Sequence, residues 1–127
     1  MNNAIFPTEI TLHQQSHLLE ITFSDNACFR LPYEFLRVHS PSAEVRRHGR
    51  DREILQTGKQ HVSILKVKQV GQYALKITFD DKHDSGLYTW EYLYQLGRDQ
   101  DALWEIYLHR LEQAGASRNT LQEHGNG

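Results

Sequence analysis

The sequence predicts an α+β domain built on antiparallel β-sheet, a meander plus a hairpin, with short helices and a C-terminal helix. Apolar and polar residues alternate in short runs before residue 32 and again between residues 62 and 79, which is typical of half-buried strands. Near the end of the chain, apolar residues recur with helical spacing instead. The length of 127 residues suits a single domain.

The first third of the chain predicts three strands. Polar breaks at residues 13–17 and 24–26 separate three short alternations of apolar and polar residues. The apolar members of these alternations are, in order, Ile10 and Leu12; Leu19, Ile21 and Phe23; and Phe29 and Leu31. Short strands with tight links predict an antiparallel meander.

A short helix is expected after the meander. Pro32 suits the first turn of a helix, because its missing N–H costs nothing there. The helix would cover Tyr33–His39, with Phe35 and Leu36 turned inward. Residues 40–60 are polar and show no apolar period, so we interpret them as a long loop.

Residues 62–70 and 73–79 predict a hairpin around Gly71 and Gln72. Four residues of the second strand should share one face: Tyr73, Leu75, Ile77 and Phe79. Residues 80–86 follow as an acidic loop that contains a histidine.

Two helices complete the domain. Thr89 can cap a helix over Trp90–Leu96 that ends at Gly97. A final helix is expected from about Gln100 to Ala114. The domain would therefore span residues 1–115, and residues 116–127 would form a disordered tail. Phe23, Phe29, Leu75, Ile77 and Phe79 should form the core, together with Trp90 and Leu93.

Composition excludes several classes of protein. The chain has one cysteine, so it can form neither an intramolecular disulfide nor a cysteine-rich zinc site. It has no apolar run of membrane-spanning length and no secretory signal pattern. A net charge of −2 gives no general attraction to nucleic acid or anionic lipid. We therefore expect a cytoplasmic protein that binds neither nucleic acid nor membrane.

Catalytic and cofactor motifs are absent from the sequence. No GxGxxG, GxxxxGK[ST], GxSxG or HExxH pattern occurs. No histidine begins an H-x-D/E triplet, the usual start of a non-haem iron site. The lone Cys28 is interpreted as a small packing residue, because no histidine and asparagine partner pattern accompanies it. We expect no enzyme activity and no resident cofactor.

The acidic loop is the most suggestive segment for metal chemistry. His83 stands between carboxylates, and imidazole with Asp81 and Asp84 is a usable ligand set for weak zinc or iron binding. The alternative is an acidic turn whose histidine hydrogen-bonds to backbone. A second polar segment holds four arginines between residues 46 and 52, which suits a partner-facing or solvated loop.

Two segments together resemble a known family. Residues 30–45 are RLPYEFLRVHSPSAEV, and residues 79–93 are FDDKHDSGLYTWEYL. Both are similar to motifs of the gamma-butyrobetaine hydroxylase-like N-terminal domain family, long catalogued as a domain of unknown function. The resemblance covers roughly residues 7–96. It implies a small α+β fold on antiparallel sheet.

The resemblance also implies what is missing here. In the carnitine-pathway dioxygenases this domain precedes a catalytic barrel, which 127 residues cannot also hold. There the domain carries zinc on three cysteines and one histidine and helps to pack the dimer. His83 matches that histidine, whereas the cysteine positions correspond to Ser40, Ser42 and Val45. Serine and valine cannot replace thiolates. His39 and His48, in or near the same loop, are candidate substitute ligands.

Relatives of the domain occur alone in bacteria and fused to scaffold ATPases linked to iron–sulfur cluster assembly. The resemblance therefore favours an accessory or protein-interaction module, connected with metal or iron–sulfur metabolism, that acts as a monomer or weak homodimer. A metal-binding protein is the alternative. Since the two motif segments meet at one ion in the zinc-bearing relatives, we expect them to lie together here. An exposed interaction patch would then contain Arg37, Arg46, Arg47 and Asp80 around His83.

Overall fold

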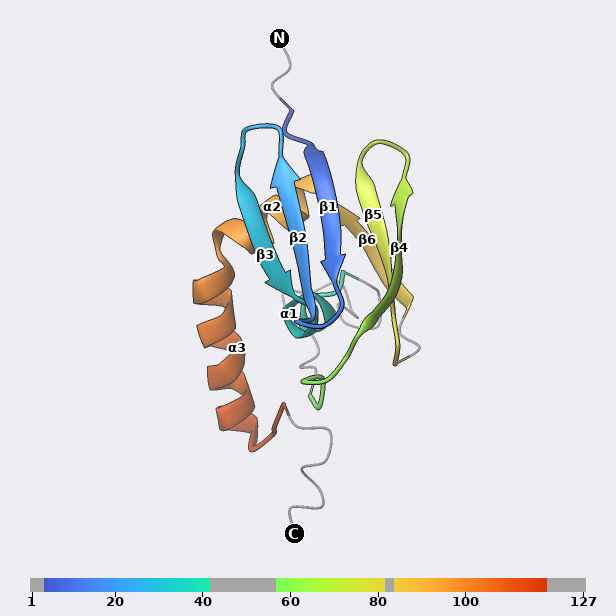
Figure 1. Ribbon diagram of the computed structural model, residues 1–127. Helices are drawn as coiled ribbons and strands as arrows, with labels where there is room; N and C mark the ends of the chain where they lie inside the picture. The colour runs from blue at the N-terminus through green and yellow to red at the C-terminus, as the bar shows by residue number, and fades with distance from the viewer. Residues whose placement is uncertain (1–3, 42–56, 82–83, 119–127) are drawn as a thin grey trace.

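The computed structural model describes residues 4–41, 57–81 and 84–118, with the side chains of residues 84 and 85 excepted. Within these residues the chain forms two three-stranded antiparallel sheets and three helices, in the order β1, β2, β3, α1, β4, β5, β6, α2, α3 (Figure 1). This arrangement confirms the predicted α+β class.

The first sheet is the predicted meander. It contains β1 (Pro7–His13), β2 (Leu18–Phe23) and β3 (Cys28–Pro32), with β2 in the centre. Ile21 of β2 lies opposite Ile10 on one side and Phe29 on the other. The inward face buries every second residue of the alternation, namely Leu19, Ile21, Phe23 and Leu31.

The second sheet extends the predicted hairpin by one strand. It contains β4 (Ile64–Val70), β5 (Ala74–Phe79) and β6 (Asp84–Thr89), again with the middle strand in the centre. The prediction of a loop over residues 80–86 is wrong from Asp84 onward, because Asp84 pairs with Thr78 of β5. An available strand edge has overridden the turn-like local sequence.

Tyr73 also departs from its expected position. Gly71 adopts a left-handed conformation with φ of 56°, and the turn places Tyr73 before β5 rather than within it. The Tyr73 ring lies over Gly71, where a Cβ atom would stand 3.2 Å from it. Tyr73 is therefore exposed, while Leu75, Ile77 and Phe79 are buried as expected.

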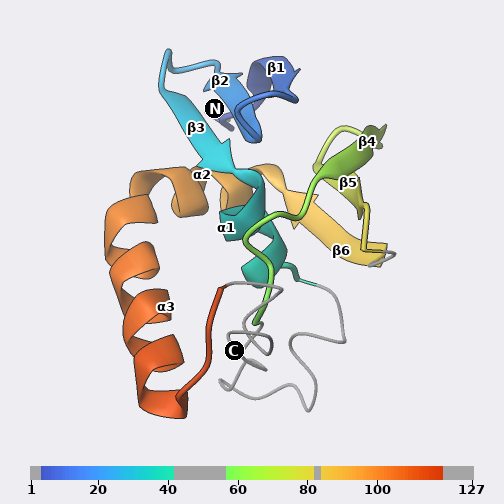
Figure 2. The same ribbon diagram turned by 60° about the horizontal axis from the view of Figure 1, so that its bottom comes forward.

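The helices are α1 (Tyr33–Val38), α2 (Trp90–Arg98) and α3 (Gln100–Ala114). Figure 2 shows α1 at the centre of the molecule, with strands of both sheets around it and α3 along one side. Thr89 caps α2 as predicted, accepting a hydrogen bond from the backbone N–H of Tyr92 at 3.1 Å. None of these described helices combines the length and apolar character needed to cross a bilayer.

Gly97 does not end α2 as predicted, because the helix continues to Arg98. The glycine serves close packing instead. A Cβ atom built on it would stand 2.3 Å from Cγ of Phe29 on β3. The Phe29 ring also makes edge contacts with Phe23 and Tyr94, which restrict its movement.

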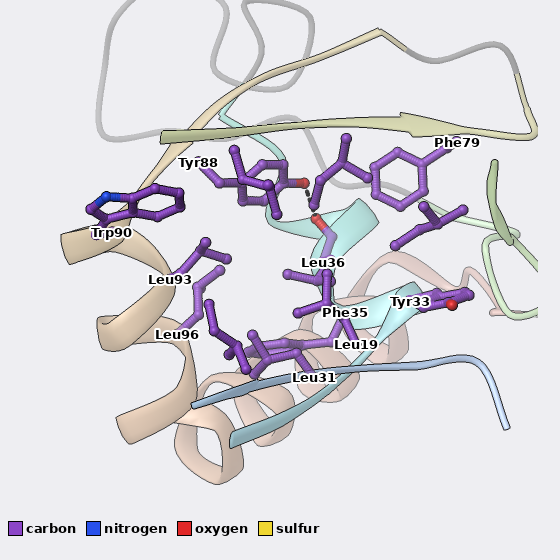
Figure 3. Packing of buried hydrophobic residues seen from close by; sticks show 14 of the residues in the cluster. Leu19, Leu31, Tyr33, Phe35, Leu36, Phe79, Tyr88, Trp90, Leu93 and Leu96 are labelled. Carbon is purple, nitrogen blue, oxygen red and sulfur yellow. Dashed lines mark hydrogen bonds between the residues drawn. The ribbon is translucent and has the colours of Figure 1, made fainter. Parts of the chain in front are cut away.

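The core lies between the two sheets, α1 and α2 (Figure 3). Phe23, Leu75, Ile77, Phe79, Trp90 and Leu93 are buried as expected, and Phe29 is partly buried against them. The Tyr88 hydroxyl reaches into this core and donates to the Leu36 carbonyl at 2.6 Å. That bond ties β6 to α1.

The segment after α3 packs back on the domain. Gly115 ends the helix in a left-handed conformation with φ of 65°. Backbone N–H groups of Gly58 and Gln60 then donate to the carbonyls of Ser117 and Arg118, both at 2.9 Å. Of the tail predicted over residues 116–127, residues 119–127 lie outside the described part of the chain.

Replacing Gly97 with alanine should destabilise the fold by about 1–3 kcal/mol, because the added methyl group overlaps the Phe29 ring. Urea unfolding measures the change in free energy. The Phe29→Ala background supplies the control, since Gly97→Ala should cost much less once the ring is removed. An equal cost in both backgrounds would contradict the packing role.

Candidate functional site

Helix α1 is buried along its whole length, although it carries two charged residues. Glu34 and Arg37 are 7% and 5% exposed. Burying a charge is costly unless it is paired and hydrogen-bonded. The partners of these two side chains therefore determine what the surrounding residues can do.

Arg37 lies against the end of β5. Its Nε donates to Oδ2 of Asp81 at 3.0 Å, and Nζ of Lys59 donates to the same oxygen at 2.9 Å. Burial by itself would raise the pKa of Asp81, but the hydrogen bond from Lys59 and the charge of Arg37 outweigh it and lower that pKa. The structure thus brings Arg37 and Asp81 together, as the resemblance implies for their two segments.

This ion-pair cluster differs from the exposed patch that the sequence suggested. The Arg37 side chain is only 6% exposed and that of Asp81 26%. Arg37 therefore joins α1 to the second sheet, and most of it is covered. A carboxylate held by two cations is a poor ligand for a third, so Asp81 is better suited to this structural pairing than to metal binding.

His39 and Tyr92 are both turned toward the interior. The His39 ring packs on Phe35, with ring centroids 4.8 Å apart. Its backbone carbonyl accepts a hydrogen bond from the Tyr92 hydroxyl at 2.6 Å. The Tyr92 hydroxyl is therefore used inside the domain.

The remaining candidates are spread or undescribed. Asp80 is exposed, and its Oδ1 accepts from the backbone N–H of Ser63 at 3.0 Å. Asp84 begins β6, and its side chain is not described. Four candidates lie outside the described residues: His48, His83, Arg46 and Arg47.

Of the three positions that correspond to zinc-ligating cysteines, only Ser40 is described. It is fully buried, and its side chain is hydrogen-bonded to Tyr88. Ser42 and Val45 lie outside the described residues. Across residues 4–41, 57–81 and 84–118, no three His, Cys, Asp or Glu side chains are grouped closely enough to hold a metal ion.

Glu34 has a partner that sequence reasoning missed. Nε and Nη2 of Arg118 donate to its two carboxylate oxygens, both at 2.9 Å. The Arg118 guanidinium also stands 5.3 Å from the centre of the Trp104 ring. Arg118 falls in the segment predicted as a disordered tail, and 84 residues separate it from Glu34, so sequence reasoning did not indicate this contact.

A groove lies at the end of the molecule where β1 begins. The start of β1, the β4–β5 turn and α2 enclose two adjoining hollows of about 700 Å³ and about 800 Å³. Both are lined by Ile5 and by Trp90, whose Nε1 donates to the Gln72 carbonyl at 2.8 Å. Ile5, Phe6 and Tyr73, which are 37%, 51% and 52% exposed, surround this end groove.

No pattern in the sequence indicated the end groove. Ile5 and Phe6 precede the first alternation, and Tyr73 was assigned to an inward strand face. The three residues gather only because the turn at Gly71 and the N-terminal segment reach the same end of the fold. Such a surface depends on tertiary structure.

Comparison with known proteins gives a family match. The sequence model of the family described as gamma-butyrobetaine hydroxylase-like, N-terminal, matches residues 10–94. Comparison with curated proteins gives no match.

Solved structures resemble the whole described fold. Two solution NMR structures share 50% and 47% sequence identity with the chain, each with a TM-score of 0.79. The alignments cover 91% and 93% of this chain and 90% and 88% of the other chains. A crystal structure of a protein of unknown function in the DUF971 family, from Acidithiobacillus ferrooxidans, shares 40% identity with a TM-score of 0.61. That alignment covers 72% of this chain and 91% of the other.

Replacing Asp81 with asparagine should lower the free energy of unfolding by about 1–3 kcal/mol at neutral pH, because it removes the charge that faces buried Arg37. Asp80→Asn is the matched control, since Asp80 is exposed and asparagine can still accept from Ser63. Urea unfolding of both variants measures the effect. Equal stability of the two would contradict the structural role of Asp81.

The comparison of wild type with Asp81→Asn also predicts a pH dependence. The folded-state pKa of Asp81 is lowered from its ordinary value of 3.8, so its stabilising contribution is complete above that value and is lost as the pH falls through the lower folded pKa. The difference in unfolding free energy between wild type and Asp81→Asn should therefore shrink below pH 3.8. A difference that grows on acidification would contradict the lowered pKa.

Proposed function

The chain belongs to the gamma-butyrobetaine hydroxylase-like N-terminal domain family, and on that basis we propose that it is a non-catalytic accessory module that binds another protein. The DUF971 relative is itself a protein of unknown function, so membership alone names no activity. The observation that carries the proposal is the end groove and its exposed apolar side chains.

The end groove has the composition of a protein-binding surface. Ile5, Phe6 and Tyr73 present apolar surface together, and Trp90 lies at the same place. Clustered apolar side chains with a polar rim are typical of interaction sites, whereas apolar side chains scattered singly are not. Glu9 and Glu91 supply polar atoms to the lining.

The ion pairs support a non-catalytic role. Asp81 contacts both Arg37 and Lys59, and Glu34 contacts Arg118. These contacts join α1 to the second sheet and to the C-terminal segment. Their charges stabilise the domain, which leaves the end groove as the better candidate for function.

The partner is to be sought in metal or iron–sulfur metabolism, given the fusions of related domains to scaffold ATPases. Under this proposal the partner, rather than this chain, binds the metal. The buried Ser40 side chain is hydrogen-bonded to Tyr88, and the Asp81 carboxylate is paired with Arg37 and Lys59. Neither residue is therefore well suited to ligate zinc or iron.

A photo-crosslinking residue at position 73 should capture a discrete partner in the native cells, because Tyr73 stands at the end groove. The same residue at position 106 is the matched control: Ile106 is similarly exposed, at 55%, but lies on α3. Mass spectrometry identifies the adducts. Identical adducts from both positions, or none from position 73, would contradict the proposal.

Protein purified without an affinity tag should contain much less than one zinc per chain after dialysis against a moderate chelator, because thiolates are missing from the positions of Ser40, Ser42 and Val45. Elemental analysis measures the content. A ratio near one zinc per chain would contradict this prediction. Loss of that zinc in His83→Ala or His39→Ala would then identify the ligands and favour the metal-binding alternative.

A further inference from the structure

The two sheets approach each other through the edges of β1 and β4. Each of these strands pairs with one neighbour only among the described residues. Figure 2 shows β4 as the strand of the second sheet that lies nearest β1. At one end Gln14 joins them: its Nε2 donates to the Ile64 carbonyl at 3.0 Å, and its Oε1 accepts from the Ser63 hydroxyl at 3.4 Å.

At the other end a hollow lies between the two strands. Residues 7–10 of β1 and Gln69 of β4 line the hollow of about 800 Å³ described above. We call the space between the edges of β1 and β4 the seam. Ile10 and Leu12 of β1 and Val67 of β4 pack against the core but are only partly buried, so these two strands keep some apolar surface exposed.

The backbone groups at the edge of β4 favour one kind of binding partner. An edge strand presents N–H and C=O groups that only another extended polypeptide can pair with in a regular ladder. A nucleic acid or a membrane cannot do so, and the net charge of −2 gives neither a general attraction. The occupant expected from the backbone is therefore a strand of protein.

The side chains of β4 specify the charge of that strand. Lys66 and Lys68 are exposed and form no ion pair with any residue in the described ranges. A carboxylate of an added strand, placed directly opposite either lysine, would form a favourable cross-strand pair with it.

Lysines on an edge strand also prevent a sheet from pairing with its own copies. That role accounts for Lys66 and Lys68, both exposed on the edge strand β4. Charge that repels a second copy of β4 attracts an acidic strand. The pattern is therefore selective as well as protective.

We propose that an acidic extended segment of a partner protein adds as a strand, within the seam, to the edge of β4 that pairs with no other described strand. Its carboxylates lie beside Lys66 and Lys68, and its alternate apolar side chains cover Val67 and Ile10. This inference rests on the proposed function and specifies the chemistry of the partner.

A seven-residue peptide of alternating glutamate and valine, with glutamate at both ends, is the probe. Titration into ¹⁵N-labelled protein should give saturable shifts of β4 amides and slow their hydrogen exchange. The Lys66→Glu/Lys68→Glu variant should bind about tenfold more weakly, because two cross-strand attractions become repulsions. Arg30→Glu on β3, at the edge of the first sheet, is the control and should bind like wild type.

A peptide with lysine in place of glutamate should bind wild type much more weakly and the double variant more tightly. Equal binding of both peptides, shifts confined to β1, or equal loss in Arg30→Glu would overturn the proposal. If the peptide binds but position 73 gives no adducts, strand addition at β4 is supported and the proposed function is contradicted. If position 73 gives adducts but the peptide does not bind, the proposed function is supported and the addition of an acidic strand to β4 is overturned.

Discussion

The burial of α1 is the constraint on which the rest of the structure depends. All six residues of this helix are buried, and the helix is in contact with core residues from both sheets. A helix of 6 residues is too short to be stable alone, so its packing must hold it in place. In return, each polar group that it carries into the interior requires a partner.

These partners connect the domain. Glu34 requires Arg118 from the C-terminal segment, and Arg37 requires Asp81 from the end of β5. The Leu36 carbonyl accepts from Tyr88 of β6. The motif residues that carry the family resemblance at α1 are therefore charged for a structural reason, which makes them poor guides to a functional surface.

Local pattern was sufficient to predict most of the fold. The meander, the capped helix after Thr89 and the C-terminal helix each follow from residues close in sequence. The predictions for Asp84 and Gly97 were wrong because both positions depend on contacts with residues distant in sequence. Strand β6 depends on pairing with β5, and the glycine depends on the Phe29 ring from another element. At the site, Arg37 and Asp81 were anticipated, but Lys59 and Arg118 were not, because their roles arise only when distant segments meet.

The same helix explains why the sheets leave a seam. If β1 and β4 paired, the two described sheets would join and neither strand would remain at an edge, since pairing satisfies both backbones. Leu19 and Leu31 of the first sheet and Ile64 and Tyr88 of the second belong to one core with Phe35 and Leu36 of α1, so a helix fills the angle between the sheets. Gln14 bridges them at one end, and the end groove lies at the other. The buried helix that stabilises the domain is thus packed between the two sheets at whose edges we propose that a partner binds.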